Sequence, residues 1–145
     1  MERVYIFDTT LRDGGQTKGV DFSFADKIAI SEALDDLGID YIEGGWPGAN
    51  PTDDKLFGSP PKLKVSNFVA FGMTRRPNTS AANDPGLNAV LSGKSDSVCL
   101  VGKTWDFHVS KALNITLEEN IDMISESVNE INKRGKQALF DCEHF

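Results

Sequence analysis

A stretch of charged, hydroxyl and glycine residues directly follows the apolar run Val4–Phe7, whose β-branched and aromatic residues predict a short buried strand. Within this stretch, Asp13 is a hard oxygen ligand for a divalent cation, and Arg12 is a permanent planar cation that pairs with a carboxylate or a developing oxyanion. Neighbouring residues of an extended segment point to opposite sides. Both side chains therefore serve one pocket only if the chain bends, which Gly14 and Gly15 permit. The alternative is a solvated turn whose carboxylates and hydroxyls satisfy only local backbone donors.

The polar stretch contains the motif Asp8-Thr9-Thr10-Leu11-Arg12-Asp13-Gly14-Gly15-Gln16. This motif resembles the opening signature of a family of metal-dependent barrel enzymes that contains isopropylmalate, homocitrate and citramalate synthases, together with hydroxymethylglutaryl-CoA lyase. Residues 16–20 and 43–51 are most similar to the citramalate synthase branch. The resemblance covers the whole chain, and it implies that residues 1–145 are the N-terminal portion of a TIM-barrel catalytic domain.

The composition is that of one globular domain, with 145 residues, of which 39% are hydrophobic and 26% charged. A formal net charge of -7 argues against nucleic acid or an anionic membrane as a partner. We expect a cytoplasmic location, because the sequence shows neither a long apolar run nor an apolar signal region. Cys99 and Cys142 fall in predicted strands, where we expect small buried hydrophobes rather than a disulfide or a reactive thiol.

Strand-like and helix-like segments alternate along the rest of the chain. After the first strand, further strands are predicted at residues 41–43, 64–72, 97–101 and 138–140. Four helices are predicted to begin after the N-cap residues Ser23, Asn50, Asp84 and Thr116. Apolar residues at helical spacing predict the buried faces of the first and last helices, namely Ile30, Ala33, Leu34 and Leu37, and Leu117, Ile121, Ile124, Val128 and Ile131.

Two parallel architectures fit this alternation. A flavodoxin-like doubly wound sheet has five strands in about this length, whereas a closed eightfold barrel needs about 250 residues. Periodicity alone favours the doubly wound sheet, because half a barrel leaves two strand edges open. The resemblance implies the barrel, so we predict an α/β fold that is the N-terminal part of a parallel (β/α) barrel. This part has about five strands and four helices of an eightfold TIM barrel.

The resemblance also implies roles for individual side chains at the carboxyl ends of the strands. The implied site residues are Arg12 and Glu143 (catalytic), Gln16, Glu43 and His108 (substrate-binding), and Asp13 (metal ligand). From the residues alone, the alternative for Glu43 is a solvent-exposed carboxylate at a strand end. The alternative for His108, equally compatible with its position, is a hydrogen-bonded surface histidine. His144 follows Glu143 and is expected to face away from the site, as adjacent residues of a strand do. Arg75 and Arg76 are expected either to hold a carboxylate or CoA phosphate, or to be solvated surface.

By resemblance, the parent enzyme is an acyltransferase of branched-chain amino-acid biosynthesis that condenses acetyl-CoA with a 2-oxo acid, most similar to the synthases that convert pyruvate to citramalate. A divalent metal (Mg, Mn or Zn) held by Asp13 is implied to polarise the ketone, and Arg12 to stabilise the alkoxide. The alternatives within the family are an isopropylmalate synthase, a homocitrate synthase and a hydroxymethylglutaryl-CoA lyase-like carbon–carbon lyase.

The sequence departs from the family pattern in its histidines. The family completes its metal site with a His-x-His pair, whereas the two histidines here are His108 and His144. We therefore expect little or no synthase activity from these residues alone, since a tight metal site needs several ligands in fixed geometry. The non-enzyme alternatives are a ligand-binding module and a self-associating half barrel, and the open strand edges lead us to expect a homo-oligomer.

Overall fold

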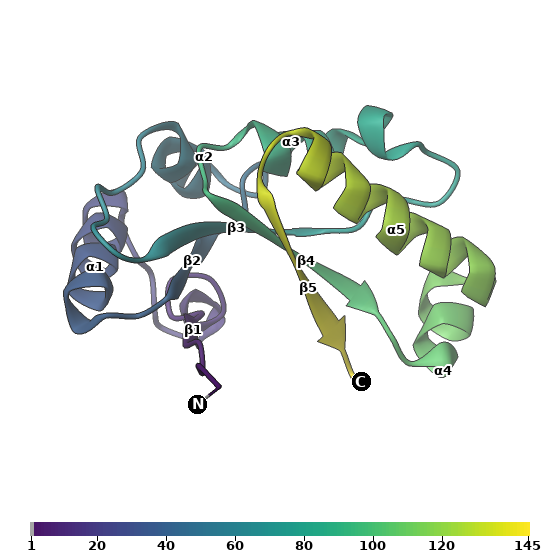
Figure 1. The fold of residues 1–145 in the computed structure, drawn as a ribbon, viewed down its shortest axis with the longest axis horizontal. Helices are drawn as coiled ribbons and strands as arrows, with labels where there is room; N and C mark the ends of the chain where they lie inside the picture. Colours follow the sequence, from purple (N-terminus) through teal and green to yellow (C-terminus); the bar gives the residue numbers. More distant parts are fainter. Residues whose placement is uncertain (1) are drawn as a thin grey trace.

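The computed structural model describes residues 2–145, which form a parallel sheet with helices between the strands (Figure 1). The strands are β1 (Phe7–Asp8), β2 (Tyr41–Gly45), β3 (Asn67–Met73), β4 (Ser97–Lys103) and β5 (Gln137–Glu143). The helices are α1 (Phe24–Leu37), α2 (Pro51–Gly58), α3 (Pro85–Ser92), α4 (Asp106–His108) and α5 (Leu117–Lys133). Short 3-10 turns lie at Gly14–Gln16 and Ala81–Asn83, and a π-helical turn lies at Val109–Leu113. None of the helices in residues 2–145 has the length and apolar character needed to cross a membrane.

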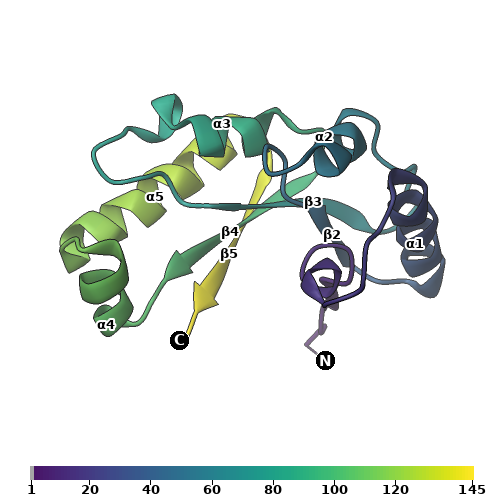
Figure 2. The ribbon, with the colours of Figure 1, turned by 180° about the vertical axis from the view of Figure 1, so that it is seen from behind.

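The strands follow one another in the order β1-β2-β3-β4-β5, and each neighbouring pair is parallel. A flavodoxin-like sheet would reverse this order at one point and carry helices on both faces. Figures 1 and 2 instead show α1, α2, α3 and α5 in an arc over one side of a curled sheet. This arrangement is that of a (β/α) barrel, so the predicted N-terminal part of a barrel is confirmed and the doubly wound alternative is wrong.

The two faces of the curled sheet have different roles. Side chains of β3, β4 and β5 with even residue numbers point toward the helices, because successive side chains of a strand alternate between its faces. With helix residues they form the main hydrophobic core, which includes Phe57, Phe68, Leu87, Leu100 and Ile131. Side chains with odd numbers lie on the concave side, which corresponds to the interior of a barrel. Cys99 and Asp141 are examples.

Side-chain caps start the helices where the sequence predicts them. The Ser23 hydroxyl accepts from the backbone N–H of Asp26, and the Asp26 carboxylate accepts from the backbone N–H of Ser23, which completes a capping box. The side chains of Asn50, Asp84 and Thr116 each accept one backbone N–H in the first turn of the helix that follows. These four helix starts are confirmed.

β1 is shorter and more exposed than predicted. Val4, Tyr5 and Ile6 precede the strand and expose 83%, 58% and 55% of their surface. The strand pairs with β2 over Phe7–Asp8, and the backbone N–H of Ile6 donates to the Asp40 carboxylate at 2.9 Å instead of to a strand. The predicted burial is wrong because β1 is an edge strand, with a single neighbour in the described part of the chain.

The apolar stripe predicted for α1 is only partly buried: Ile30 and Leu34 pack against a small core, but the fully buried positions of the helix are polar. Lys27, Ser31 and Asp35 are buried, whereas Leu37 is 75% exposed. The reason lies in tertiary contacts. Lys27 forms an ion pair with a carboxylate of α2, and Asp35 accepts the backbone N–H groups of residues 64–66.

The apolar stripe predicted for α5 is only partly buried. Ile131 is completely buried, but Leu117 and Ile121 expose 50% and 63% of their surface. Asn120 and Ser127 occupy buried positions instead. The Asn120 side-chain amide donates to the backbone carbonyl of Lys103, at the end of β4, at 2.9 Å. The Ser127 hydroxyl accepts from the backbone N–H of Arg75, just beyond the end of β3, at 2.9 Å.

Two further features differ from the predictions. The helical segment at residues 106–113, which carries His108, was not predicted, because one turn of each helix type is too short to show a periodicity. Cys99 is buried as expected, but Cys142 is exposed, since β5 is the other edge of the sheet.

Candidate active site

The loop after β1 bends the chain in the way that the paired glycines predict. The backbone carbonyl of Thr9 accepts hydrogen bonds from the N–H groups of Arg12, Asp13 and Gly14, at 3.2, 2.8 and 3.2 Å. Leu11 anchors the turn in a small core, with 1% of its surface exposed. The side chains of Arg12 and Asp13 consequently lie together, with 3.2 Å between Nη1 and Oδ1.

The Arg12 side chain connects this loop to β2 and β3. Its Nε donates to Oε2 of Glu43 at 2.7 Å, and its Cζ lies 4.0 Å from the centre of the Phe71 ring, a cation–π distance. Glu43 is 1% exposed, so the solvent-exposed alternative for this carboxylate is wrong. Burial raises the pKa of Glu43, and Arg12 opposes that shift by stabilising the carboxylate. The buried pair therefore holds the guanidinium in one orientation.

Arg12 and Glu43 face a cavity of about 310 Å³ on the concave side of the sheet. Its other lining residues are Phe7, Thr9, Cys99, Leu139, Phe140 and Asp141. Burial, with the nearby Glu43 and Asp141 carboxylates, raises the pKa of Cys99 to about 12. The thiol is therefore protonated at neutral pH and unsuited to act as a nucleophile.

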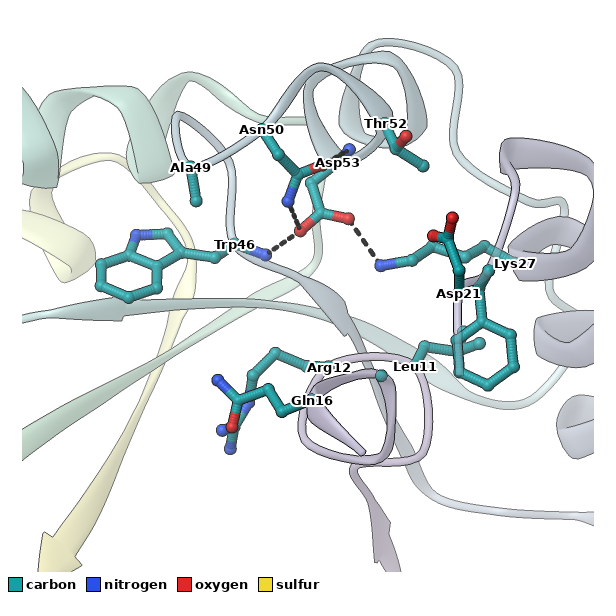
Figure 3. Close-up of a pocket in the computed structure, with 12 residues that line it drawn as sticks. Leu11, Arg12, Gln16, Asp21, Lys27, Trp46, Ala49, Asn50, Thr52 and Asp53 are labelled. Carbon is teal, nitrogen blue, oxygen red and sulfur yellow. Dashed lines mark hydrogen bonds and ion pairs between the residues drawn. The ribbon is translucent and has the colours of Figure 1, made fainter. Parts of the chain in front are cut away.

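A second cavity, of about 380 Å³, lies on the other side of Arg12 and contains Gln16 in its wall (Figure 3). Lys27 and Asp53 form a buried ion pair in the same wall, with 2.5 Å between Nζ and Oδ1. Asp53 also accepts the backbone N–H of Trp46 at 2.9 Å, so the pair fixes the segment that follows β2. Sequence reasoning missed both residues, because an i,i+26 contact leaves no local pattern. Trp46 also lines this cavity.

A second group of predicted residues lies at the ends of β4 and β5. The Glu143 carboxylate forms an ion pair with Lys103, and hydrogen bonding to Lys103 lowers the pKa of Glu143. The ring centre of His108 lies 4.7 Å from that of Trp105. Its Nδ1 is buried and has no hydrogen-bond partner within residues 2–145, unlike that of a hydrogen-bonded surface histidine.

His144 joins this group, contrary to the prediction that it faces away. Its ring centre lies 4.8 Å from that of His108 in an edge-to-face arrangement. The prediction assumed a strand, but β5 ends at Glu143 and His144 has a φ of 56°. This left-handed conformation redirects the side chain.

The two arginines after β3 form ion pairs with helix residues. Arg75 is 5% exposed and binds Glu119 at 2.9 Å and Glu126 at 2.6 Å, both on α5. Arg76 pairs with Asp84, the cap of α3, at 3.3 Å. Arg75 thus connects β3 to α5 and fits neither the phosphate-binding nor the solvated alternative.

The structure separates the predicted site residues into two sets. Arg12, Asp13, Gln16 and Glu43 gather around β1 and β2, while His108 and Glu143 gather around β4 and β5. Since the sheet is parallel, both sets lie at the carboxyl ends of their strands, the edge at which barrel enzymes place their active sites.

Asp13 is accessible to a cation, with 61% of its side chain exposed. Within residues 2–145, no group of three or more His, Cys, Asp or Glu side chains is arranged to hold a metal ion. The described residues therefore fit a divalent ion in part: they provide one oxygen ligand beside a fixed guanidinium.

Solved structures that match this arrangement of strands and helices include hydroxymethylglutaryl-CoA lyases. The enzyme from Brucella melitensis matches with a TM-score of 0.71 at 18% identity, over 99% of this chain and 52% of that chain. The enzyme from Pseudomonas aeruginosa matches with a TM-score of 0.73 at 16% identity, over 95% of this chain and 45% of that chain. These likenesses identify the fold as part of a TIM barrel.

The chain belongs to the HMGL-like family, whose model matches residues 3–145. An (R)-citramalate synthase from Aquifex aeolicus is 50% identical over 146 residues, which cover 99% of this chain and 28% of that protein. An (R)-citramalate synthase from Sulfolobus acidocaldarius is 45% identical, over 98% of this chain and 28% of that protein. A 2-isopropylmalate synthase from Solidesulfovibrio magneticus is 31% identical, over 97% of this chain and 27% of that protein. The predicted family is thus confirmed, and the chain spans about 28% of the length of the first two relatives.

Proposed function

We propose that the protein to which this chain belongs is an acyltransferase that condenses acetyl-CoA with pyruvate to give citramalate. Five (R)-citramalate synthases are 42–50% identical to the chain, compared with 30–35% for three 2-isopropylmalate synthases, which supports the citramalate branch. A hydroxymethylglutaryl-CoA lyase of the same fold was solved in complex with coenzyme A and 3-methylmalate. We also propose that residues 1–145 are the N-terminal portion of the catalytic barrel.

The observation that carries this proposal is the Arg12–Glu43 pair beside Asp13 at the carboxyl end of β1 and β2. Glu43 and the Phe71 ring hold the guanidinium in place, so it is preorganised to stabilise negative charge on a bound oxygen atom. Asp13, exposed beside it, would supply one ligand to a divalent metal (Mg, Mn or Zn). Such a metal, when bound, would polarise the ketone of the 2-oxo acid as a Lewis acid.

The remaining residues have roles in binding and proton transfer. Gln16 lines the second cavity beside Arg12 and would contact substrate there. The partnerless Nδ1 of His108 would bond the carbonyl region of the acceptor. Glu143, kept ionised by Lys103, would accept a proton during the condensation.

Isothermal titration calorimetry of Mn²⁺ into the protein to which this chain belongs, with and without pyruvate, tests this proposal. Pyruvate should tighten Mn²⁺ binding, and Asp13→Ala should weaken it at least about tenfold, since loss of a residue that only supports a metal ligand already costs about 10- to 100-fold. Asp36→Ala is the matched control, because Asp36 is an exposed carboxylate on α1 that pairs with Lys64. Equal loss in both variants, or no effect of pyruvate, would contradict the assignment of Asp13.

The acceptor specificity needs a separate comparison. Pyruvate should bind more tightly than a branched 2-oxo acid if the citramalate assignment is correct, and the reverse order would favour an isopropylmalate synthase. The expected cytoplasmic location and homo-oligomeric state stay predictions, as does the low activity of these residues alone.

A further inference from the structure

The end of β5 has an unusual backbone conformation. His144 has a φ of 56°, and the backbone N–H of Phe145 donates to the carbonyl of Cys142 at 3.2 Å, so the chain turns directly after Glu143. Residues other than glycine adopt positive φ uncommonly, at a cost in conformational energy. In a continued strand, the His144 ring would lie on the opposite face from the Glu143 carboxylate. The turn instead places both side chains on one side.

The two oxygens of the Glu143 carboxylate face different partners. Oε2 is ion-paired with Nζ of Lys103, and Oε1 lies 3.8 Å from Nε2 of His144. The backbone of Glu143 is also held, because its carbonyl accepts from Oγ1 of Thr104 at 2.8 Å. The carboxylate therefore sits between an ammonium group and an imidazole.

The charges around Glu143 favour its ionised form. Lys103 on β4 contributes most, and His144 and His108 add weaker attractions, so the pKa of Glu143 is lowered despite partial burial. The arginines at residues 75–76 are neutralised by carboxylates of α5 and of the α3 cap. The groups that set the charge state of Glu143 are thus Lys103 and the two imidazoles.

We propose that His144 is a positioning residue for Glu143: its imidazole holds the Oε1 side of the carboxylate and keeps Glu143 ready to accept a proton. This role rests on the proposed function, in which Glu143 takes part in proton transfer. It also explains the position of the His108 ring, which packs edge-to-face against His144 with its Nδ1 left without a protein partner in residues 2–145. One histidine then serves the carboxylate, and the other is available to the substrate.

Carbon-13 NMR titration of the Glu143 carboxyl group in the whole chain tests the proposal without any ligand. His144→Gln removes the imidazole that lies 3.8 Å from Oε1, and with it an attraction that lowers the pKa of Glu143. The Glu143 midpoint should rise by about 0.3–1 pH unit, the scale of a partly exposed charge pair at this distance. Lys103→Met should raise it more, and His108→Gln less, following the order of these groups around the carboxylate.

His144 is exposed, so His144→Gln should keep the fold. The backbone amide signals in an NMR spectrum of the variant check this. In the unsubstituted chain, a nuclear Overhauser effect between the His108 and His144 rings should report their contact. A Glu143 midpoint that moves less than about 0.1 pH unit in His144→Gln would overturn the proposal, as would the absence of the ring contact. Neither result depends on metal or pyruvate binding, so failure here is distinct from failure of the proposed function.

Discussion

Replacement of Arg12 by methionine tests whether the Arg12–Glu43 pair organises the site. The Arg12 side chain is 17% exposed and that of Glu43 is 1% exposed, so the substitution leaves a buried carboxylate without its cation. Removing one member of a buried pair costs about 3–5 kcal/mol, because the other charge stays uncompensated. Water reaches the Arg12 side, so we expect about 3 kcal/mol of lost unfolding free energy, near the lower end of that range.

A double-mutant cycle separates the pair from its surroundings. Glu43→Gln should cost less, about 1–2 kcal/mol, since Arg12 keeps Asp13 as a partner at 3.2 Å and the amide still accepts a hydrogen bond. The double variant leaves no buried charge unpaired, so its cost should fall about 2 kcal/mol below the sum of the single costs.

The pH dependence of Arg12→Met has a defined sign. Burial already raises the pKa of Glu43, and loss of the guanidinium removes the main opposing interaction, so the native pKa rises further. A carboxyl group whose pKa is raised in the native state binds its proton more tightly there than in the unfolded chain. Stability of the variant should therefore decrease as pH rises from the unfolded pKa to the native pKa of Glu43, and then level off.

Urea unfolding followed by circular dichroism measures these free energies. Lys64→Met is the matched control, because it breaks an ion pair with Asp36 whose side chains are 75% and 66% exposed, and it should change stability by less than about 0.5 kcal/mol. An Arg12→Met cost no larger than that of the control, or single costs that simply add, would refute the reasoning.

Two further predictions concern buried groups outside the Arg12–Glu43 pair. Burial alone would raise the pKa of Asp35, but hydrogen bonds from the backbone N–H groups of residues 64–66 outweigh burial and lower that pKa strongly. The ionised carboxylate therefore adds stability at neutral pH, and this stability is lost as pH falls through its native pKa. Asp35→Asn should lower the melting temperature at neutral pH and flatten its acid dependence in calorimetric scans, and a variant as acid-sensitive as the original chain would contradict this account. Iodoacetamide at mildly alkaline pH should modify exposed Cys142 and spare Cys99, whose pKa burial raises to about 12. Mass spectrometry should find one adduct on the native chain and two in denaturant, and rapid modification of Cys99 in the native chain would show that its environment is more open.

Several local features were predictable from the sequence because their causes are local. The caps at Ser23, Asn50, Asp84 and Thr116 each act within three residues, so residue type and spacing were enough to predict them. The motif at residues 8–16 likewise predicted a bent loop that brings Arg12 and Asp13 together. The barrel itself came from the resemblance, since periodicity alone favoured a doubly wound sheet.

Other features depend on residues that are distant in sequence. The burial of Glu43 and its pairing with Arg12 join residues 31 positions apart, and the Lys27–Asp53 pair joins residues 26 apart. Neither pairing leaves a periodic signal, because the partners are chosen by the packing of strands and helices. Polar residues consequently took the fully buried positions of α1, beside the partly buried Ile30 and Leu34 of the predicted apolar stripe.

The end of β5 shows the same limit at the scale of a single residue. The sequence determined that a carboxylate and a histidine are adjacent there, and strand geometry predicted opposite directions for them. Only the folded chain decided that the strand stops at Glu143 and that His144 turns against the ring of His108. The contact between these rings joins residues 36 positions apart, so no rule based on neighbouring residues predicts it.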